Sequence, residues 1–122
     1  MAAVTSTLSL TSTDLTTDSL SVSVTNNLSG INTGGMTRIK AKGTGSGSKE
    51  LLAEADHFTG PAYVYLKNCD TGSDNIYLEL GTAENMVIAP GEWVWFPWRA
   101  ANDINIWATT TLTIAEYGIF GI

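Results

Sequence analysis

The sequence predicts an all-β fold: a single-domain β-sandwich or jelly roll with a Ser/Thr-rich strand or arm at its N-terminus. Short stretches of alternating apolar and polar residues recur along the chain, which is the period of a strand with one buried face. Turn-forming residues separate these stretches about every 8 to 12 residues, the spacing typical of sandwiches. The length of 122 residues suits one domain.

Serine and threonine are concentrated at the start of the chain, whereas aromatic residues are confined to its second half. Serine and threonine fill 19 of the first 48 positions, and all 11 aromatic residues lie between Phe58 and Phe120. Large aromatic side chains dominate the energetics of cores and interfaces. We therefore expect residues 1–18 to form an arm or edge strand and residues 19–122 to form the sandwich.

Alternation and β-propensity predict seven to nine short strands, within residues 8–10, 20–24, 36–42, 62–66, 76–80, 86–88, 93–96, 104–108 and 112–118. Pro90-Gly91 is a turn signal, and Pro97 is expected to close the strand before it. Residues 49–56 fit either a short helical turn or a strand.

The tryptophans form a cluster late in the chain. In a strand over 93–96, Val94 and Phe96 face the core, which leaves Trp93 and Trp95 on the other face. Such tryptophans either serve a binding surface or plug an open end of the sandwich. The interface candidates are Leu8, Leu10, Trp93, Trp95, Trp98, Arg99 and Trp107.

Charge and composition argue against several classes of partner. Asp and Glu outnumber Lys and Arg by 12 to 6, giving a net charge of -6 and a pI near 4.4. Binding to nucleic acid or to an anionic membrane requires a basic face, so neither is expected. The apolar runs are too short for a membrane span. The first residues lack the features of a signal peptide, and a single cysteine fits a reducing compartment.

One motif matches a catalytic signature without its context. Asp70-Thr71-Gly72-Ser73 matches the loop of aspartic proteases, but the polar residues 67–69 before it do not suit a buried carboxylate pair. We interpret it as a turn-rich loop between two strands. Asp70, Asp74 and Asn75 also offer oxygen ligands, so whether this loop binds a surface ion such as Ca²⁺ stays open.

The remaining motifs are incomplete. Residues 43–49 resemble a phosphate-binding loop, but Ser48 stands where the glycine before the lysine is required. His57 and Cys69 are the only residues of their types, too few for a structural zinc site. We therefore expect no metal, no cofactor and no enzymatic activity.

The second half of the chain carries an ordered series of motifs: YVYLKN at 63–68, IYLELG at 76–81, IAPGEW at 88–93, FP at 96–97 and EYGIF at 116–120. Over about residues 60 to 120, this series resembles small virion structural proteins of tailed bacteriophages, of the capsid decoration or cement type. The resemblance implies a non-enzymatic β-sandwich that is assembled in the host cytoplasm and binds the outside of the capsid.

The partners implied by the resemblance are the major capsid protein and further copies of the chain, as a homotrimer. Related folds also occur as tail, neck or fibre components. A carbohydrate- or receptor-binding module is a further alternative, in which an exposed Trp95 or Trp98 stacks on a sugar ring and the loop of Asp70, Asp74 and Asn75 binds its hydroxyl groups.

Overall fold

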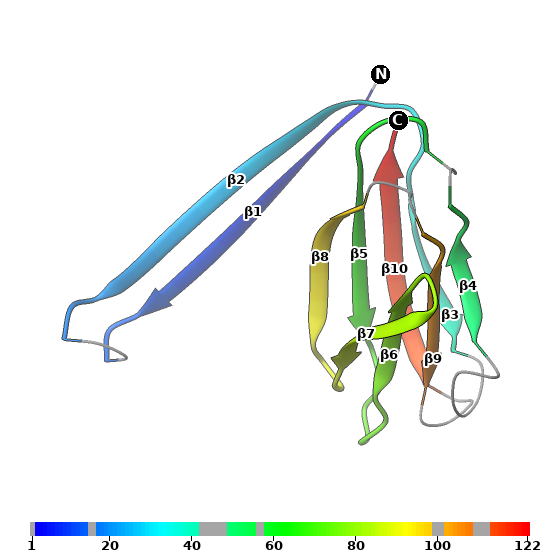
Figure 1. Ribbon diagram of the computed structural model, residues 1–122. Coiled ribbons are helices and arrows are strands. Elements are labelled where there is room, and N and C mark those ends of the chain that lie inside the picture. The colour runs from blue at the N-terminus through cyan, green and yellow to red at the C-terminus, as the bar shows by residue number, and fades with distance from the viewer. Residues whose placement is uncertain (1, 15–16, 42–48, 56–57, 99–101, 109–112) are drawn as a thin grey trace. The chain divides into compact units, whose positions relative to one another are not determined.

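The structure is a computed structural model that describes residues 2–14, 17–41, 49–55, 58–98, 102–108 and 113–122. Within these ranges the chain forms ten strands and no helix (Figure 1). Its contacts divide it into two units, Met1–Asn32 and Thr33–Ile122. The predicted all-β class is confirmed. The described part of the chain has no helix that is long and apolar enough to span a membrane.

The first unit is a long β-hairpin. Strands β1 (Ala2–Ser12) and β2 (Leu20–Ile31) pair antiparallel with each other and with no other strand. Near the open end of the hairpin, Gly30 has no residue opposite it and forms a bulge. Its φ of +75° is a conformation that glycine adopts without steric cost.

The boundary between the two units differs from the predicted one. We placed it after residue 18, whereas the structure pairs β2 with β1 and places the boundary after Asn32. Residues 20–31 thus belong to the N-terminal arm and not to the sandwich. Alternation identifies a strand but does not identify its partner, which is why the sequence did not separate these possibilities.

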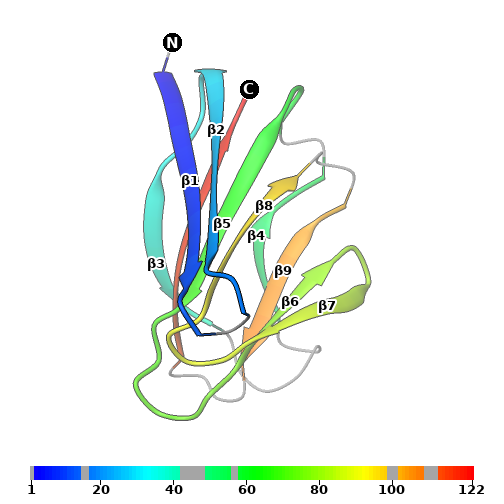
Figure 2. The same ribbon diagram turned by 90° about the vertical axis from the view of Figure 1, so that its left-hand side faces the viewer.

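The second unit is a sandwich of two four-stranded sheets. The first sheet contains, in spatial order, β3 (Met36–Lys40), β10 (Ile114–Gly121), β5 (Ala62–Asn68) and β8 (Trp93–Trp98). The second contains β4 (Glu50–Ala53), β9 (Ile104–Ala108), β6 (Ile76–Leu80) and β7 (Ala83–Ile88). Figure 2 shows β9, β6 and β7 side by side in the second sheet.

The strand pairing is that of a jelly roll. Four antiparallel pairs are nested around the β6–β7 connection: β6 with β7, β5 with β8, β4 with β9, and β3 with β10. Two further pairings, β5 with β10 and β6 with β9, join this rolled ribbon into two sheets. The predicted sandwich or jelly roll is therefore confirmed.

The core lies between the two sheets and follows the period of two. Alternate residues of β5 are buried, and the core cluster continues with isoleucine and leucine side chains from β6 and β9. Val94 and Phe96 of β8 pack against this cluster, as predicted. Each buried aliphatic side chain contributes about 1.5–3 kcal/mol to stability relative to its exposed state.

Three local expectations have clear outcomes. Of the two alternatives for residues 49–56, the structure shows the strand β4. The turn at Pro90-Gly91 is confirmed: the Glu92 N–H donates to the Ala89 carbonyl at 3.0 Å, and Gly91 has a φ of +82°. Pro97 does not close β8 but lies within it. β8 is an edge strand, where the missing N–H of proline is tolerated.

Candidate functional site

The hairpin carries an exposed apolar face. Directly paired residues of antiparallel strands point to the same side of the sheet, and the register places Leu8 opposite Val24 and Leu10 opposite Val22. These four side chains are 44%, 56%, 48% and 38% exposed, in that order. The register gives the hairpin apolar face seven members: Val4, Leu8, Leu10, Leu20, Val22, Val24 and Leu28.

The opposite face of the hairpin is polar. It consists of serine, threonine and asparagine side chains apart from Ala3 near one end. The Thr5 hydroxyl donates to the Asn27 side-chain oxygen at 2.9 Å, and the hydroxyl groups of Thr7 and Thr25 lie 3.2 Å apart. These cross-strand hydrogen bonds support the pairing. The hairpin is therefore amphipathic, and the hairpin apolar face is interrupted by the polar pair Ser6–Asn26 and ends at Ser12.

Both edges of the hairpin lack the usual protection against further strand pairing. Natural edge strands carry lysine, proline, inward-pointing charges or bulges that prevent another strand from adding. Neither β1 nor β2 contains a charged residue or a proline, and the one bulge lies near the open end. The hairpin therefore offers an apolar face and two edges that pair with no other strand of the described chain.

The sequence identified only part of this surface. Leu8 and Leu10 were predicted as interface residues, and the structure places both on the hairpin apolar face. Val22 and Val24 were missed because their strand was assigned to the sandwich. The sequence did contain a signal for a separate hairpin. From residue 2 to residue 31 the only charged residues are Asp14 and Asp18, which lie at the turn between the two strands.

A second surface covers the outer face of the first sheet of the sandwich. Trp95 stacks on Tyr63, with ring centroids 5.3 Å apart, and tilts toward Phe120 at 6.2 Å. Trp93 is 53% exposed. Nine of the outward residues of β3, β10, β5 and β8 form what we call the aromatic sheet face: Met36, Arg38, Tyr63, Tyr65, Lys67, Trp93, Trp95, Glu116 and Phe120.

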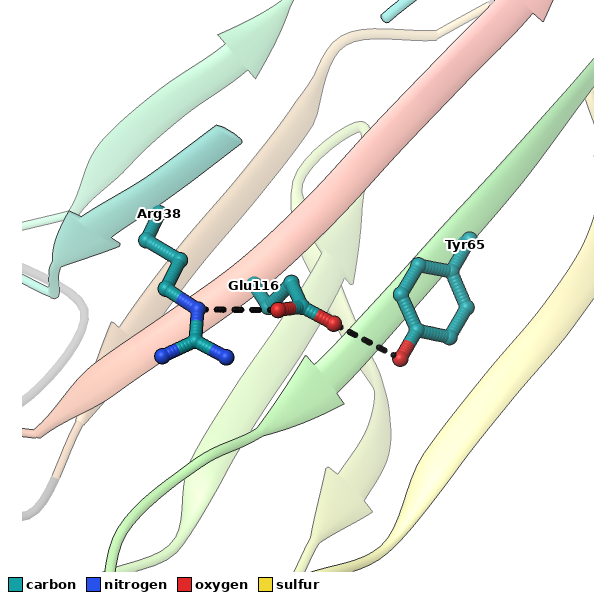
Figure 3. A network of polar contacts seen from close by, with 3 residues as sticks. All are labelled: Arg38, Tyr65 and Glu116. Carbon is teal, nitrogen blue, oxygen red and sulfur yellow. Dashed lines mark hydrogen bonds and ion pairs between the residues drawn. The ribbon is translucent and has the colours of Figure 1, made fainter. Parts of the chain in front are cut away.

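A polar network crosses the aromatic sheet face (Figure 3). The Arg38 Nε donates to Glu116 Oε2 at 2.8 Å, and the Tyr65 hydroxyl donates to Glu116 Oε1 at 3.1 Å. The hydrogen bond from Arg38, followed by that from Tyr65, lowers the pKa of Glu116. Burial and the neighbouring carboxylate raise the pKa of Tyr65. A hollow of about 210 Å³ lies beside this network, lined by Met36, Thr37, Arg38 and Glu116.

Two of the predicted interface tryptophans are packed inside the chain. Trp98 is 5% exposed, meets Phe58 edge to face at 5.9 Å and donates its indole N–H to the Asn102 carbonyl at 3.1 Å. Trp107 is 6% exposed and stacks on Tyr77 at 5.4 Å. Because both rings are buried against neighbours in the same chain, we no longer count them as interface candidates. Arg99 lies outside the described residues.

The Asp70 side chain stabilises the loop in which it lies through hydrogen bonds to the backbone. Its Oδ2 accepts hydrogen bonds from the Gly72 N–H at 2.9 Å and from the Asp74 N–H at 3.0 Å. This arrangement is an Asx-type turn, and it agrees with our interpretation of residues 70–73 as a turn-rich loop. The described residues contain no group of three or more His, Cys, Asp or Glu that could hold a metal ion.

Other candidates from the sequence are not brought together. Cys69 is half-buried at the end of β5, where its backbone N–H donates to the Ile114 carbonyl at 2.9 Å. His57 and residues 43–48 of the glycine-rich segment lie outside the described residues. In the part of the chain that the structure describes, the surfaces best suited to recognition are the hairpin apolar face and the aromatic sheet face.

No protein-family model and no curated protein matches the chain.

Proposed function

We propose that the chain is a non-enzymatic structural protein of a tailed-bacteriophage virion, a decoration protein that binds the outside of the major capsid shell and stabilises it. The observation that carries the proposal is that the chain exposes two apolar surfaces, the hairpin apolar face and the aromatic sheet face. Contiguous exposed apolar surface marks a site of association, and an uncharged hairpin with open edges is suited to assembly rather than to catalysis.

The fold and the resemblance support the same proposal. Jelly rolls are a common architecture of viral capsid proteins, although a fold alone does not determine function. The motifs that resemble virion proteins lie in the sandwich, and two of them meet there. The Asn68 backbone N–H, at the end of YVYLKN, donates to the carbonyl of Glu92 in IAPGEW at 3.0 Å.

In this proposal the aromatic sheet face contacts the shell. Exposed tryptophan and arginine are the residue types that contribute most to protein interfaces, and this face presents both, with Lys67 and Glu116 between Trp93 and Arg38 in the register. A standard interface buries about 1,600 Å² in total. Repeated over the many copies on one shell, such contacts resist the outward pressure of packaged DNA.

The test is co-sedimentation of the purified chain with heads that lack their decoration protein, followed by heating of the decorated heads. We expect the chain to sediment with the heads and to raise the temperature at which they release DNA. Trp93→Ser should weaken binding at least tenfold, whereas Val87→Ser, which alters an equally exposed side chain of the second sheet, should not. A chain that stays in the supernatant, or binding that is equal in both variants, contradicts the proposal.

A second candidate is carbohydrate binding, favoured by the exposure of Trp93. An indole face can stack on the C–H groups of a sugar ring, and the Arg38–Glu116 pair, two to three strands away, can bind hydroxyl groups of a further ring in the same glycan. Tryptophan fluorescence during titration with host surface glycans tests this alternative. A saturable shift that Trp93→Ser abolishes supports it, and no response across a broad panel contradicts it.

A further inference from the structure

The outer face of the first sheet carries an excess of positive charge, although the chain as a whole is acidic. The register places three cations on this face, Arg38 and Lys40 of β3 and Lys67 of β5, and we call them the basic cluster. The four strands of the sheet, all of which the structure describes, present Glu116 as the one carboxylate on the same side. Because the net charge of the chain is -6, the excess of negative charge lies on other parts of the molecule.

The carboxylate of Glu116 leaves the two lysines of the basic cluster unpaired. Its oxygens accept hydrogen bonds from the Arg38 Nε at 2.8 Å and from the Tyr65 hydroxyl at 3.1 Å (Figure 3). Neither Lys40 nor Lys67 forms an ion pair with a residue that the structure describes. Both amino groups are therefore available to a carboxylate of another molecule.

Two further carboxylates adjoin the sheet in loops, and both are engaged there. Asp70 follows β5, and its Oδ2 accepts the Gly72 N–H at 2.9 Å. Glu92 precedes β8, and its Oε2 accepts the Ala89 N–H at 2.8 Å. Each carboxylate is thus held by a backbone N–H group of its own turn and not by a lysine of the basic cluster.

Exposed apolar side chains flank the basic cluster. Ile114 lies opposite Lys40 in the register, Trp93 lies opposite Lys67, and Met36 follows on β3; all three are exposed. Methionine, arginine and aromatic residues are enriched in protein interfaces. A sugar would instead place its hydroxyl groups against the isoleucine and the methionine, where they find no hydrogen-bond partner. The combination of cations and aliphatic groups therefore favours a protein segment as the occupant.

We infer that this face binds an acidic segment of the shell protein, whose carboxylates pair with Lys40 and Lys67 and whose apolar side chains cover the exposed ones beside them. The inference rests on the proposed function and adds the chemistry of the partner. The row of Arg38, Glu116, Lys67 and Trp93 crosses four strands, or about 14 Å, which is roughly the length of four extended residues. A short segment is thus long enough to contact the whole row.

The distribution of charge also orients the chain on such a partner. Complementary charges steer the encounter of two proteins, and like charges suppress wrong orientations. The basic cluster attracts an acidic segment, whereas the acidic surfaces of the same chain repel it. The chain therefore approaches an acidic shell with the outer face of the first sheet.

The first experiment is co-sedimentation of charge variants with heads that lack their decoration protein. We expect Lys67→Gln to weaken binding about fivefold and the double variant Lys40→Gln/Lys67→Gln about tenfold or more. Thr82→Glu, in the exposed turn after β6, changes the net charge by the same amount as Lys67→Gln and should bind like the wild type. Near-ultraviolet circular dichroism of each variant shows whether the sandwich is still folded.

Salt dependence and an apolar substitution separate the two parts of the contact. The Debye length falls from about 10 Å at 0.1 M salt to about 3 Å at 1 M. Wild-type binding should weaken over this range, and binding of the double lysine variant should change much less. Ile114→Ser should also weaken binding, whereas Leu51→Ser, which alters an exposed side chain of the second sheet, should not.

Chemical coupling of decorated heads identifies the contact directly. A carbodiimide joins a lysine amine to a carboxylate in contact with it, with loss of water. We expect mass spectrometry to find peptides in which Lys40 or Lys67 is joined to an aspartate or glutamate of the shell protein. Cross-links to the shell that involve only other lysines of the chain would place the contact elsewhere and overturn the inference.

Failure of this inference can be distinguished from failure of the proposed function. If the wild type binds heads and Lys67→Gln binds as well as Thr82→Glu does, the acidic partner is wrong and the proposed function stands. If the wild type does not bind heads, both are wrong. Binding of polysialic acid that depends on Lys67, without binding to heads, identifies an acidic glycan as the occupant and also overturns the inference.

Discussion

The side chain of Asn68 donates a hydrogen bond to the carbonyl of Ile88, 20 residues along the chain, at a distance of 2.9 Å. The same amide group donates to the Asp74 carbonyl at 2.8 Å, and its oxygen accepts the Asp70 N–H at 2.9 Å. Asn68 is fully buried. It thus ties the loop after β5 to the end of β7, and no polar atom of its side chain is left without a partner.

We expect Asn68→Ala to destabilise the sandwich by about 3 kcal/mol, because it leaves several backbone groups without their hydrogen bonds in the core. Urea unfolding followed by tryptophan fluorescence measures this loss. Ser73→Ala, in the exposed part of the same loop, is the control and should change stability little. Equal effects of the two substitutions would show that Asn68 is not the residue that holds the loop.

We expect the contribution of Glu116 to stability to depend on pH. Arg38 and Tyr65 lower its pKa in the folded state, so its stabilising effect is complete above the unfolded carboxyl pKa of about 4.3 and is lost as the pH falls through the lower folded value. Glu116→Gln should therefore lower the melting temperature by a few degrees at pH 7, and this difference should shrink progressively as the pH falls below about 4.

The control for this prediction is the partner residue. In an Arg38→Gln background the same Glu116→Gln substitution should have a smaller effect at pH 7, since the ion pair is already absent. Thermal scans at several pH values compare the four proteins. A difference that stays constant down to pH 2 would refute the assigned role of the Arg38–Glu116 pair.

Thr113 carries a buried hydroxyl group that has no hydrogen-bond partner among the residues that the structure describes. A buried polar group in this state costs about 1 kcal/mol or more. We expect Thr113→Val, which keeps the shape and removes the hydroxyl, to stabilise the chain by about 1 kcal/mol. Thr113→Ser retains the hydroxyl, loses a methyl group and should be destabilising. Chemical denaturation of both variants decides the point, and a destabilised Thr113→Val variant would contradict it.

Gly118 lies where three neighbours leave no space for a side chain. A Cβ atom there would lie 2.5 Å from the Met36 sulfur and 2.9 Å from the Gly35 carbonyl oxygen. We expect Gly118→Ala to cost about 1–3 kcal/mol through displacement of β3. Gly35→Ala meets no atom within 4 Å and serves as the control. Indistinguishable melting temperatures for the two variants would show that the strands adjust freely.

Much of the fold was predictable because it depends on local pattern. The alternation in residues 62–66 and 76–80 identified two central strands, and Pro90-Gly91 identified a turn that the structure confirms. The assignment of Val94 and Phe96 to the core followed from the period of two. Pro97 was misjudged because the pattern does not show that its strand lies at an edge, where no N–H is needed.

The candidate site was predictable only in part. Leu8 and Leu10 were recognised as apolar residues in an N-terminal segment that lacks aromatic residues. Their partners Val24 and Val22 were assigned to the sandwich. The Arg38–Glu116 pair joins residues 78 positions apart and left no local signal. Trp98 and Trp107 were included because tryptophan is common in interfaces, yet both are buried by rings from other elements.

The sequence by itself determined which residues form strands, which of their faces are apolar and where turns interrupt them, because these properties depend on neighbours within a few positions. Only the tertiary structure decided which strands pair. In the observed pairing, β2 forms a hairpin with β1, and the other eight strands form the nested pairs of a jelly roll. Pairing is set by backbone hydrogen bonds and by contacts between distant residues, and the backbone groups are the same in every strand. Whether an apolar face is buried or exposed therefore follows from its partner and not from its pattern.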